Sequence, residues 1–365
     1  MLKIAVIGGD GIGPEVTAQG LRCLDKLAKG SGGFAYQVTQ TPFSGARYLK
    51  ENIVITEDEV ADLKENYDAV YLGAVGRPDV VPGIMERGLL LKLRFELDLF
   101  INLRPVKLYP GVQTPLAGKT AEHIDMVVIR ENTEDLYCGV GGFLRKGTKD
   151  EVAVQEMMAT RMGVDRCLRY AFELCQARNK KDPRKGKKLT LVGKTNILTY
   201  AQDLWMRAFT EMGEKEFPGI QREYHHVDAC CMYMVIKPEI YDVIVTGNMF
   251  GDIITDLGAA IAGGMGVAAS GNLDPTGKNP SIFEPIHGSA PDIAGQNKAN
   301  PIAAILSIAM LLQQTGRVKK DMKVAAAGDR LEAAVVKVCP RFAGLPFDRL
   351  PMPTAQVTDL VLAEL

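Results

Sequence analysis

The sequence predicts an α/β fold with more than one lobe, and two kinds of pattern carry this prediction. Five short apolar segments are each followed by glycine, asparagine or charged residues, and they read KIAVIG, DAVYLG, DMVVIR, KLTLVG and YDVIVT. Runs rich in valine, isoleucine and leucine are typical of strands that helices cover on both faces. A length of 365 residues exceeds one ordinary hydrophobic core, so two domains or lobes are expected.

Composition and charge exclude several classes of protein. Hydrophobic residues make up 47% of the chain and charged residues 24%, as in a soluble globular protein. The formal net charge of -1 gives no reason to expect nucleic acid or a membrane surface as partner. The longest apolar run, residues 302–312, is far shorter than the roughly 20 residues that span a bilayer, and it predicts a buried core helix.

The cysteines and the N-terminus indicate the compartment. Seven cysteines form no C-x-x-C spacing, and an odd number without a framework favours reduced thiols in a cytoplasmic protein. The N-terminal MLKIAVIGGDGIGPE lacks the pattern of a signal peptide and predicts a first strand and turn. This turn resembles a dinucleotide-binding loop, but Pro14 stands where G-x-G-x-x-G requires its last glycine. A Rossmann domain is therefore not expected.

The middle of the chain contains three segments without catalytic signals. Residues 138–156 have glycines at one end and an alternating Val152/Val154 pattern at the other, which predicts a protruding hairpin. Residues 160–178 carry apolar side chains on one helical stripe and predict a structural helix. The basic run at 178–188 is typical of a polar loop rather than a nucleic-acid site.

The stretch GNMFGDIITDLG (247–258) follows a predicted buried strand and places two acids four residues apart. Residues i and i+4 share a helix face, so the carboxylates of Asp252 and Asp256 repel each other unless a cation lies between them. Taken alone, the pair also fits an ordinary helix start with one acid near its positive end.

A set of cations lies at predicted strand and helix ends. Arg94 and Arg104 flank an apolar stretch, and Arg130 ends the strand DMVVIR, with Tyr137 seven residues later. Arginine forks bind carboxylates in a bidentate way, so the three could clamp a dicarboxylic acid, although each alone also fits a surface ion pair. Lys194 follows the strand KLTLVG, at an edge where α/β proteins bind ligands.

The segment EPIHGSAPDIAGQNKANP (284–301) is the second candidate for a nucleotide site. Its glycines and small residues expose backbone N–H groups, and Asp292 could accept a hydrogen bond from a ribose 2′-hydroxyl. An acid there repels a 2′-phosphate, which favours NAD over NADP. An ordinary surface loop fits this segment equally well.

Several motifs occur in the order found in one family, the metal-dependent β-decarboxylating dehydrogenases that act on 3-isopropylmalate, isocitrate, homoisocitrate, tartrate or D-malate. These motifs read GGDGIGPE, NLRP, RENTEDLYCG, GKTN, HVDACCM, GNMFGDIITD and EPIHGSAPDIAGQNKANP. The resemblance covers essentially the whole chain. It implies a two-lobed, non-Rossmann α/β homodimer with residues 1–102 and 258–365 in the first, cofactor-binding lobe. Residues 103–257 would form the second lobe, and the hairpin at 138–156 would clasp the partner subunit.

The resemblance also implies roles for individual residues. Arg94, Arg104 and Arg130 match the clamps of the substrate carboxylates, and Tyr137 and Lys194 match the catalytic pair. Asp228, Asp252 and Asp256 match the ligands of Mg²⁺ or Mn²⁺. Lys194 and Asp228 are expected to reach the neighbouring subunit's site, where Asp228 also faces the substrate. The NAD site is expected to comprise His287, Gly288, Ser289, Ala290, Pro291, Asp292, Ile293 and Asn300, with Gly73 and Glu86 toward the nicotinamide.

Two details depart from the family pattern. GGDGIG lacks the usual proline before Asp10, a change of small effect. RENTED carries Asp135 where glycine is common, two residues before Tyr137, and this could alter the local turn.

The substrate prediction depends on residues 85–94, MERGLLLKLR. Isocitrate enzymes carry serine and asparagine where this chain has Gly88 and Leu90, and an unpaired third carboxylate against Leu90 and Leu91 would be costly to bury. The pattern favours the isopropyl group of 3-isopropylmalate, a substrate of leucine biosynthesis. The tartrate/D-malate branch remains the alternative because VGRPDVVP and SGNLDP resemble that branch too. A non-catalytic regulatory subunit is a further alternative, but such subunits usually lose part of the clamp or metal set.

Overall fold

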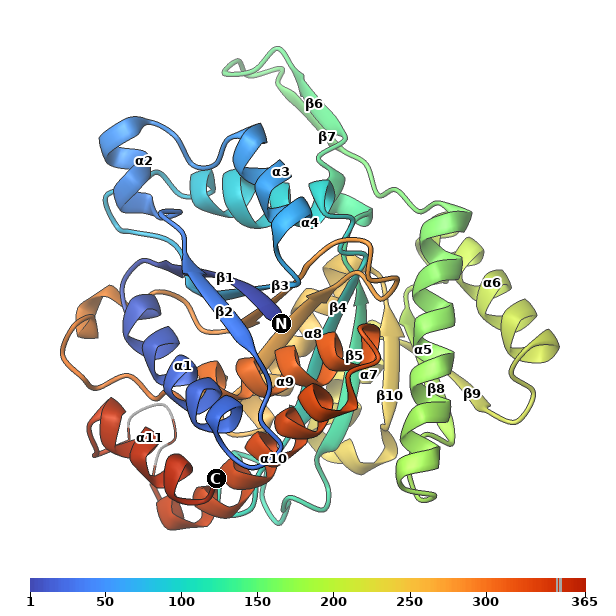
Figure 1. The fold of residues 1–365 in the computed structure, drawn as a ribbon. Coiled ribbons are helices and arrows are strands. Elements are labelled where there is room, and N and C mark those ends of the chain that lie inside the picture. The colour runs from blue at the N-terminus through green and yellow to red at the C-terminus, as the bar shows by residue number, and fades with distance from the viewer. Residues whose placement is uncertain (346, 348–349) are drawn as a thin grey trace.

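The computed structural model describes residues 1–345, 347 and 350–365, which form a mixed α/β structure around a large sheet (Figure 1). The strands are β1 (Leu2–Gly9), β2 (Tyr36–Gln40), β3 (Ala69–Ala74), β4 (Ile101–Lys107), β5 (Asp125–Glu131), β6 (Gly141–Leu144), β7 (Val152–Gln155), β8 (Lys188–Gly193), β9 (Gln221–His226), β10 (Val243–Thr246), β11 (Ala269–Leu273) and β12 (Ser281–Pro285). Within the described residues, ten strands form one sheet in the order β2-β1-β3-β12-β11-β4-β5-β10-β8-β9, and β6 pairs with β7 alone.

Helices cover both faces of the sheet. They are α1 (Gly13–Lys29), α2 (Gly45–Glu51), α3 (Glu57–Asn66), α4 (Lys92–Glu96), α5 (Arg161–Lys181), α6 (Ala201–Lys215), α7 (Val227–Ile236), α8 (Asn248–Ile261), α9 (Ile302–Val318), α10 (Met322–Val338) and α11 (Thr354–Ala363). Helices α1 and α9 pack on the part of the sheet around β1, β3 and β12, and α5 packs on β5, β8 and β10. Helix α8 packs against β4, β5 and β10.

The five predicted strands are confirmed as β1, β3, β5, β8 and β10, whose mutual pairings are parallel. Five other strands of the sheet gave no clear apolar signal. For β4 and β11 the reason is that each strand is buried yet carries polar side chains, such as Asn102 on β4 and Asn272 on β11. β11 pairs in antiparallel fashion with both β4 and β12.

The predicted lobe boundaries fall inside regular elements. Residue 103 lies in β4, in the middle of the sheet, and residue 258 lies in the last turn or so of α8. One buried apolar cluster runs across both halves of the sheet, and a second fills the space between the sheet and α2, α3 and α4. The division of the chain into two lobes at these residues stays a prediction.

The apolar run 302–312 is confirmed as a core helix. It forms the first part of α9, and every residue from Ile302 to Leu312 is buried. The Tyr71 hydroxyl of β3 donates a 2.9 Å hydrogen bond to the carbonyl of Ala304, which fixes the helix against the sheet. None of the helices in the described parts of the chain has the length and apolar character needed to cross a bilayer.

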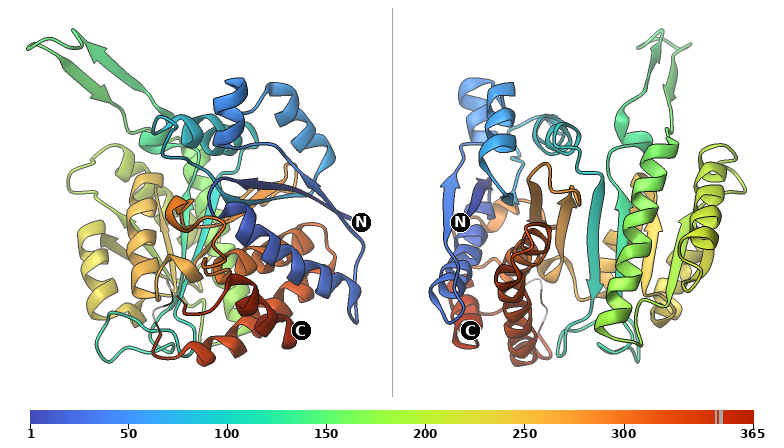
Figure 2. Two further views of the ribbon diagram at one scale, coloured as in Figure 1. Left: turned by 90° about the vertical axis from the view of Figure 1, so that its left-hand side faces the viewer. Right: turned by 45° about the vertical axis from the view of Figure 1, so that its right-hand side comes forward.

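The predicted hairpin is confirmed, and Figures 1 and 2 show β6 and β7 projecting away from the rest of the molecule. Its apolar side chains are exposed, among them Phe143 and Leu144 on β6 and Val152 and Val154 on β7. The predicted helix at 160–178 is also confirmed, but α5 continues to Lys181. The polar loop predicted for 178–188 therefore begins too early, because its first four residues continue the helix, and the basic Arg178, Lys180 and Lys181 suit its negative end.

Candidate active site

Asp252 and Asp256 lie on α8, which begins two residues after β10 ends, as the sequence predicted. Asp252 forms an ion pair with the Arg130 guanidinium, and its Oδ2 accepts a 2.7 Å hydrogen bond from the Tyr137 hydroxyl. Asp256 is largely exposed, and its Oδ1 lies 3.9 Å from Nη1 of Arg104. Each carboxylate thus faces a different arginine. In this single chain, the repulsion between the two carboxylates is therefore reduced by two separate arginines and not by one shared cation.

The three predicted clamp arginines come together from α4, β4 and β5, and all of them are buried. Arg94, Arg104 and Arg130 are only 7%, 8% and 1% exposed. Burial lowers the pKa of Arg94 to about 10, and the nearby positive charges of Arg130 and Arg104 act in the same direction against the attraction of Glu284. The Arg94 Nε atom is buried and has no partner among the described residues. A cluster of buried cations with unused donors is suited to a small dianion.

Two buried amides bind these arginines and a carboxylate lies near the third, and sequence reasoning missed all three residues. Arg130 Nε donates to Oδ1 of Asn248 at 2.9 Å, and Arg104 Nε donates to Oδ1 of Asn102 at 2.9 Å. Arg94 Nη2 lies 3.8 Å from Oε1 of Glu284. All three residues stand inside quoted motifs, since Asn102 begins NLRP, Asn248 lies in GNMFGD and Glu284 begins EPIHGS. The sequence does not indicate that these polar residues are buried beside the arginines, and this is why they were missed.

Tyr137 lies in the short helix η2 (Asp135–Cys138), and its position depends on Asp135. The backbone of Asp135 has φ +70°, a left-handed conformation that glycine adopts easily and aspartate tolerates. Its Oδ2 accepts a 3.0 Å hydrogen bond from the N–H of Met249 in the first turn of α8. The expected disturbance of the turn is therefore absent, because Asp135 takes a glycine-like conformation and links η2 to α8.

Lys194 and Asp228 come from other segments of the sequence than the arginine cluster, and they form an ion pair with each other. Lys194 Nζ is 2.9 Å from Oδ2 of Asp228, at the start of α7. Among the described residues of this one chain, histidine, cysteine, aspartate and glutamate side chains form no group of three or more that could hold a metal ion. Asp228 therefore does not join Asp252 and Asp256 within a single chain.

The predicted cofactor segment forms a loop on the glycine turn at the end of β1. The Ile12 N–H donates to the Ser289 carbonyl at 2.8 Å, and a side-chain carbon at Gly11 would lie 1.9 Å from that oxygen. Burial lowers the pKa of His287, and its Nε2 is buried with no partner among the described residues. Asp292 is exposed, whereas Asn300 is buried and donates to the Phe347 carbonyl at 2.6 Å. The amide of Asn300 thus has a structural partner already.

Four further predicted residues remain. One lies in β3, and the other three lie in the helical turn directly before α4. Gly73 is buried in β3, and a side-chain carbon there would lie 2.7 Å from the Gly13 carbonyl oxygen. Glu86 is exposed and accepts a 3.0 Å hydrogen bond from the Gly83 N–H. Leu90 and Leu91 are half-buried at the end of the π-helical turn Glu86–Leu91, directly before α4 and Arg94.

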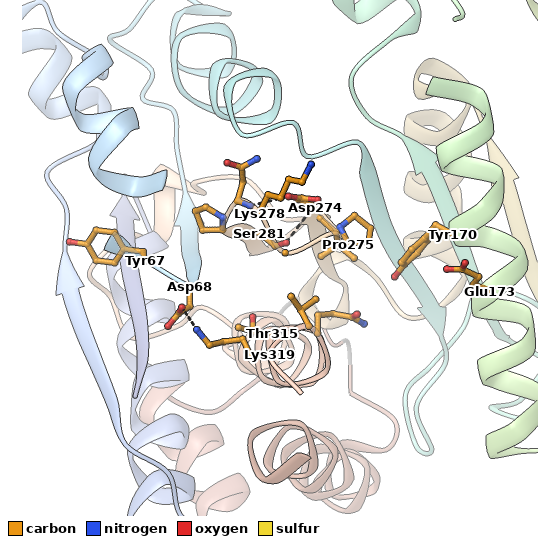
Figure 3. Close-up of a pocket in the computed structure, with 16 residues that line it drawn as sticks. Tyr67, Asp68, Tyr170, Glu173, Asp274, Pro275, Lys278, Ser281, Thr315 and Lys319 are labelled. Atoms are coloured by element: carbon orange, nitrogen blue, oxygen red, sulfur yellow. Dashed lines mark hydrogen bonds and ion pairs between the residues drawn. The ribbon is translucent and has the colours of Figure 1, made fainter. Parts of the chain in front are cut away.

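A pocket of about 270 Å³ lies elsewhere in the molecule. Figure 3 shows Tyr170 and Glu173 of α5 on one side of it and Tyr67 and Asp68 on the other, with the turn from Asp274 to Ser281 between them and Lys319 below. None of the predicted site residues lines this pocket. The arginine cluster, and not this pocket, therefore marks the candidate active site.

Comparison with known proteins decides the family. A model of the family described as isocitrate/isopropylmalate dehydrogenase matches residues 3–342. The chain belongs to the isocitrate/isopropylmalate dehydrogenase family. It is 50% identical to the 3-isopropylmalate dehydrogenase of Corynebacterium jeikeium over 365 residues, which is 100% of both chains. It is 52% identical to that of Thermobifida fusca over 315 residues, 86% of either chain.

Two solved structures have the same fold as this chain. The isocitrate dehydrogenase from Methylococcus capsulatus superposes with a TM-score of 0.83 and 32% identity, covering 100% of this chain and 99% of that one. The TT0538 protein from Thermus thermophilus gives a TM-score of 0.81 at 32% identity, covering 100% of this chain and 68% of that one. The predicted fold class is confirmed, and the chain is a dehydrogenase of this family.

Proposed function

We propose that the chain catalyses the oxidative decarboxylation of 3-isopropylmalate to 4-methyl-2-oxopentanoate with NAD⁺ and a divalent metal ion, a step of leucine biosynthesis. The observation that carries this proposal is the 50% identity, over full length, to a protein named 3-isopropylmalate dehydrogenase. The half-buried Leu90 and Leu91, just before Arg94, support an apolar substrate group at this end of the site.

The arginine cluster would bind and orient the substrate. Two carboxylates can be held by the guanidinium groups of Arg94, Arg104 and Arg130, whose burial keeps water from competing. Arg94 Nε, which has no partner in the part of the chain that the structure describes, would provide a free donor for the substrate. Binding of both carboxylates would fix the orientation of the substrate's hydroxyl-bearing carbon for the reaction.

The acids fit a hard divalent cation. Asp252 and Asp256 supply oxygen donors four residues apart on α8, and oxygen donors are the ligands that Mg²⁺ and Mn²⁺ prefer. A third carboxylate would come from the partner subunit's Asp228. Such an ion, when bound, supplies Lewis-acid polarisation of the substrate oxygens.

Two side chains would move protons. Lys194, released from its ion pair with Asp228, presented to the partner's site and deprotonated to the neutral amine, would accept the proton of the substrate hydroxyl. Tyr137, whose hydroxyl already donates to Asp252, would protonate the substrate carbon that loses CO₂. Burial and the hydrogen bond to Asp252 raise the pKa of Tyr137, so its hydroxyl remains a proton donor at neutral pH.

The loop 284–301 would hold NAD⁺, which accepts the hydride when bound. The exposed Asp292 would accept from a ribose hydroxyl, and the buried Nε2 of His287, which has no partner among the described residues, would offer one further polar contact. Gly288, Ser289, Ala290, Pro291 and Ile293 would line the same site. Contacts of Gly73, Glu86 and Asn300 with the cofactor stay predictions.

A homodimer would complete the site. Helices α7 and α8 expose Met232, Val235, Ile236 and Ile253, and an exposed apolar surface of this kind is typical of a subunit interface. The exposed apolar side chains of the β6–β7 hairpin support its role as an arm that clasps the partner. The cytoplasmic location stays a prediction, and all seven cysteines are unpaired.

A substrate comparison tests this proposal against the tartrate/D-malate alternative. NADH absorbance would be followed with 3-isopropylmalate and with D-malate, each with NAD⁺ and Mn²⁺. The proposal predicts the higher kcat/KM with 3-isopropylmalate. A higher value with D-malate would assign the chain to the other branch of the family.

A further inference from the structure

A buried amide on β11, that of Asn272, lies at the centre of a hydrogen-bond network behind the arginine cluster. Its Oδ1 accepts from Nδ2 of Asn102 and from Nδ2 of Asn132, each at 3.1 Å. Its Nδ2 donates to Oε1 of Glu284 at 2.8 Å. The three asparagines are fully buried, and Glu284 is nearly so. Both the oxygen and the nitrogen of the Asn272 amide are therefore engaged by protein groups.

Both ends of this network reach a predicted clamp arginine. On one side, Asn102 uses its Oδ1 to accept from Nε of Arg104 at 2.9 Å. On the other side, Glu284 lies 3.8 Å from Nη2 of Arg94. Asn272 is thus one residue removed from each arginine.

Sheet register explains why these residues meet. Asn272 stands directly opposite Asn102 in the antiparallel pair β11–β4, and Asn102 stands opposite Arg130 in the pair β4–β5. The side chain of Asn132, just beyond β5, also donates to the Leu99 carbonyl at 2.8 Å. The Leu99 N–H in turn donates to the Arg94 carbonyl at 2.9 Å. The network therefore ties the backbone that carries Arg94 to the sheet that carries Arg104.

The arginines need such support because their own charges push them apart. Besides burial, the charges of Arg130 and Arg104 lower the pKa of Arg94. The direct contacts of Arg94 with Glu284 and of Arg104 with Asp256 are long, at 3.8 and 3.9 Å. Contacts of that length do not fix a guanidinium. The Asn272 amide accepts from two donors through its oxygen and donates to a carboxylate through its nitrogen, so one side chain joins three partners.

We propose that Asn272 is a positioning residue, which sets the spacing of Arg94 and Arg104 for a hydroxy-dicarboxylate. The inference rests on the proposed function, in which these arginines bind the substrate carboxylates. Asn272 acts only through Asn102 and Glu284.

Two substitutions test the role of the amide. Asn272→Asp keeps both acceptor contacts but places a carboxylate against Glu284, whereas Asn272→Leu removes every polar contact at similar size. The KM for the hydroxy acid should rise about tenfold or more in both variants, because Asn272→Asp loses the bond to Glu284 and Asn272→Leu loses all three bonds of the amide. The double variant Asn272→Asp/Glu284→Gln restores an amide–carboxylate contact with donor and acceptor exchanged. It should recover part of the increase, by about threefold or more.

A spacing readout separates positioning from general damage. Inhibition by malonate, succinate and glutarate should depend strongly on chain length in the wild type and weakly in the Asn272 variants. Thr190→Val is the matched control, since Thr190 is fully buried in β8 of the same sheet but its hydroxyl contacts Glu223 at 3.4 Å and no arginine. It should leave both KM and the length dependence unchanged.

The outcomes are distinct from those for the proposed function. The wild-type substrate comparison identifies the hydroxy acid, and the variants are then assayed with whichever acid the wild type prefers. Unchanged KM and unchanged length dependence in folded Asn272 variants would overturn the inference, and so would an absence of recovery in the double variant.

Discussion

The Tyr137 hydroxyl donates a 2.7 Å hydrogen bond to Oδ2 of Asp252. The bond joins a predicted proton donor to a predicted metal ligand from another segment of the chain, and the Arg130 guanidinium lies 5.1 Å from the Tyr137 ring centre. Burial opposes ionisation of Asp252, but Arg130 and the Tyr137 hydrogen bond outweigh it and lower the pKa of Asp252. The acid is thus ready to bind a cation at neutral pH.

Removing the Tyr137 hydroxyl should affect turnover more than binding. Tyr137→Phe keeps the ring beside Arg130 but removes the proton donor, so kcat should fall about 100-fold while KM for the hydroxy acid changes little. Steady-state NADH formation measures both constants. An unchanged kcat would exclude Tyr137 as the acid.

The same residue gives a pH prediction. Since burial raises the pKa of the Tyr137 phenol above its ordinary value of 10.0, the protonated donor should persist until the pH exceeds that value. The wild-type kcat should therefore show no loss from this group between pH 7 and about 9.5. A decline within that window that is absent from Tyr137→Phe would contradict the assignment.

Asp135 should contribute to stability in two separable ways. Asp135→Gly keeps the left-handed backbone but loses the hydrogen bond to the Met249 N–H, so it should lower the free energy of unfolding by about 1 kcal/mol. Asp135→Ala loses that bond and also strains the backbone, for a total of about 2–3 kcal/mol. Urea unfolding of both variants measures the difference. Equal stability of the two would show that the left-handed backbone costs nothing at this position.

Leu90→Glu tests the apolar pocket. A carboxylate there would face the isopropyl group and would be costly to desolvate, so kcat/KM for 3-isopropylmalate should fall about 100-fold. The value for D-malate, which lacks that group, should fall less than about tenfold. Leu90→Met is the matched control, because it keeps an apolar side chain of similar volume. Equal losses for both substrates would place the isopropyl group elsewhere.

Much of this molecule could be predicted from its residues, and the failures have physical causes. Five parallel strands can be recognised in the sequence as apolar runs, because helices cover both faces of β1, β3, β5, β8 and β10. The strands β4 and β11 do not, because their buried faces hold Asn102, Arg104, Ser270 and Asn272 in place of apolar side chains. The amides of Asn102 and Asn272 form a hydrogen bond with each other although they are 170 residues apart in the sequence. A single sequence contains no signal that predicts such a contact.

The metal site was predictable only by resemblance. Asp252 and Asp256 stand together in one motif, whereas Asp228 lies on another helix and pairs with Lys194 in the single chain. No spacing in the sequence links it to the other two. Its role depends on a second subunit, so the shared site is the central claim of this account.

Mixed dimers test that claim most directly. Asp228→Asn and Asp252→Asn subunits, each inactive alone, would be co-expressed with different tags, and the mixed dimers isolated and assayed for NADH formation from the preferred hydroxy acid with Mn²⁺. If the sites are shared, each mixed dimer holds one intact site, so activity should recover to about half of the wild-type value per dimer and disappear with EDTA. Mixed dimers as inactive as their parents, or turnover by Asp252→Asn alone in the presence of EDTA, would contradict the account.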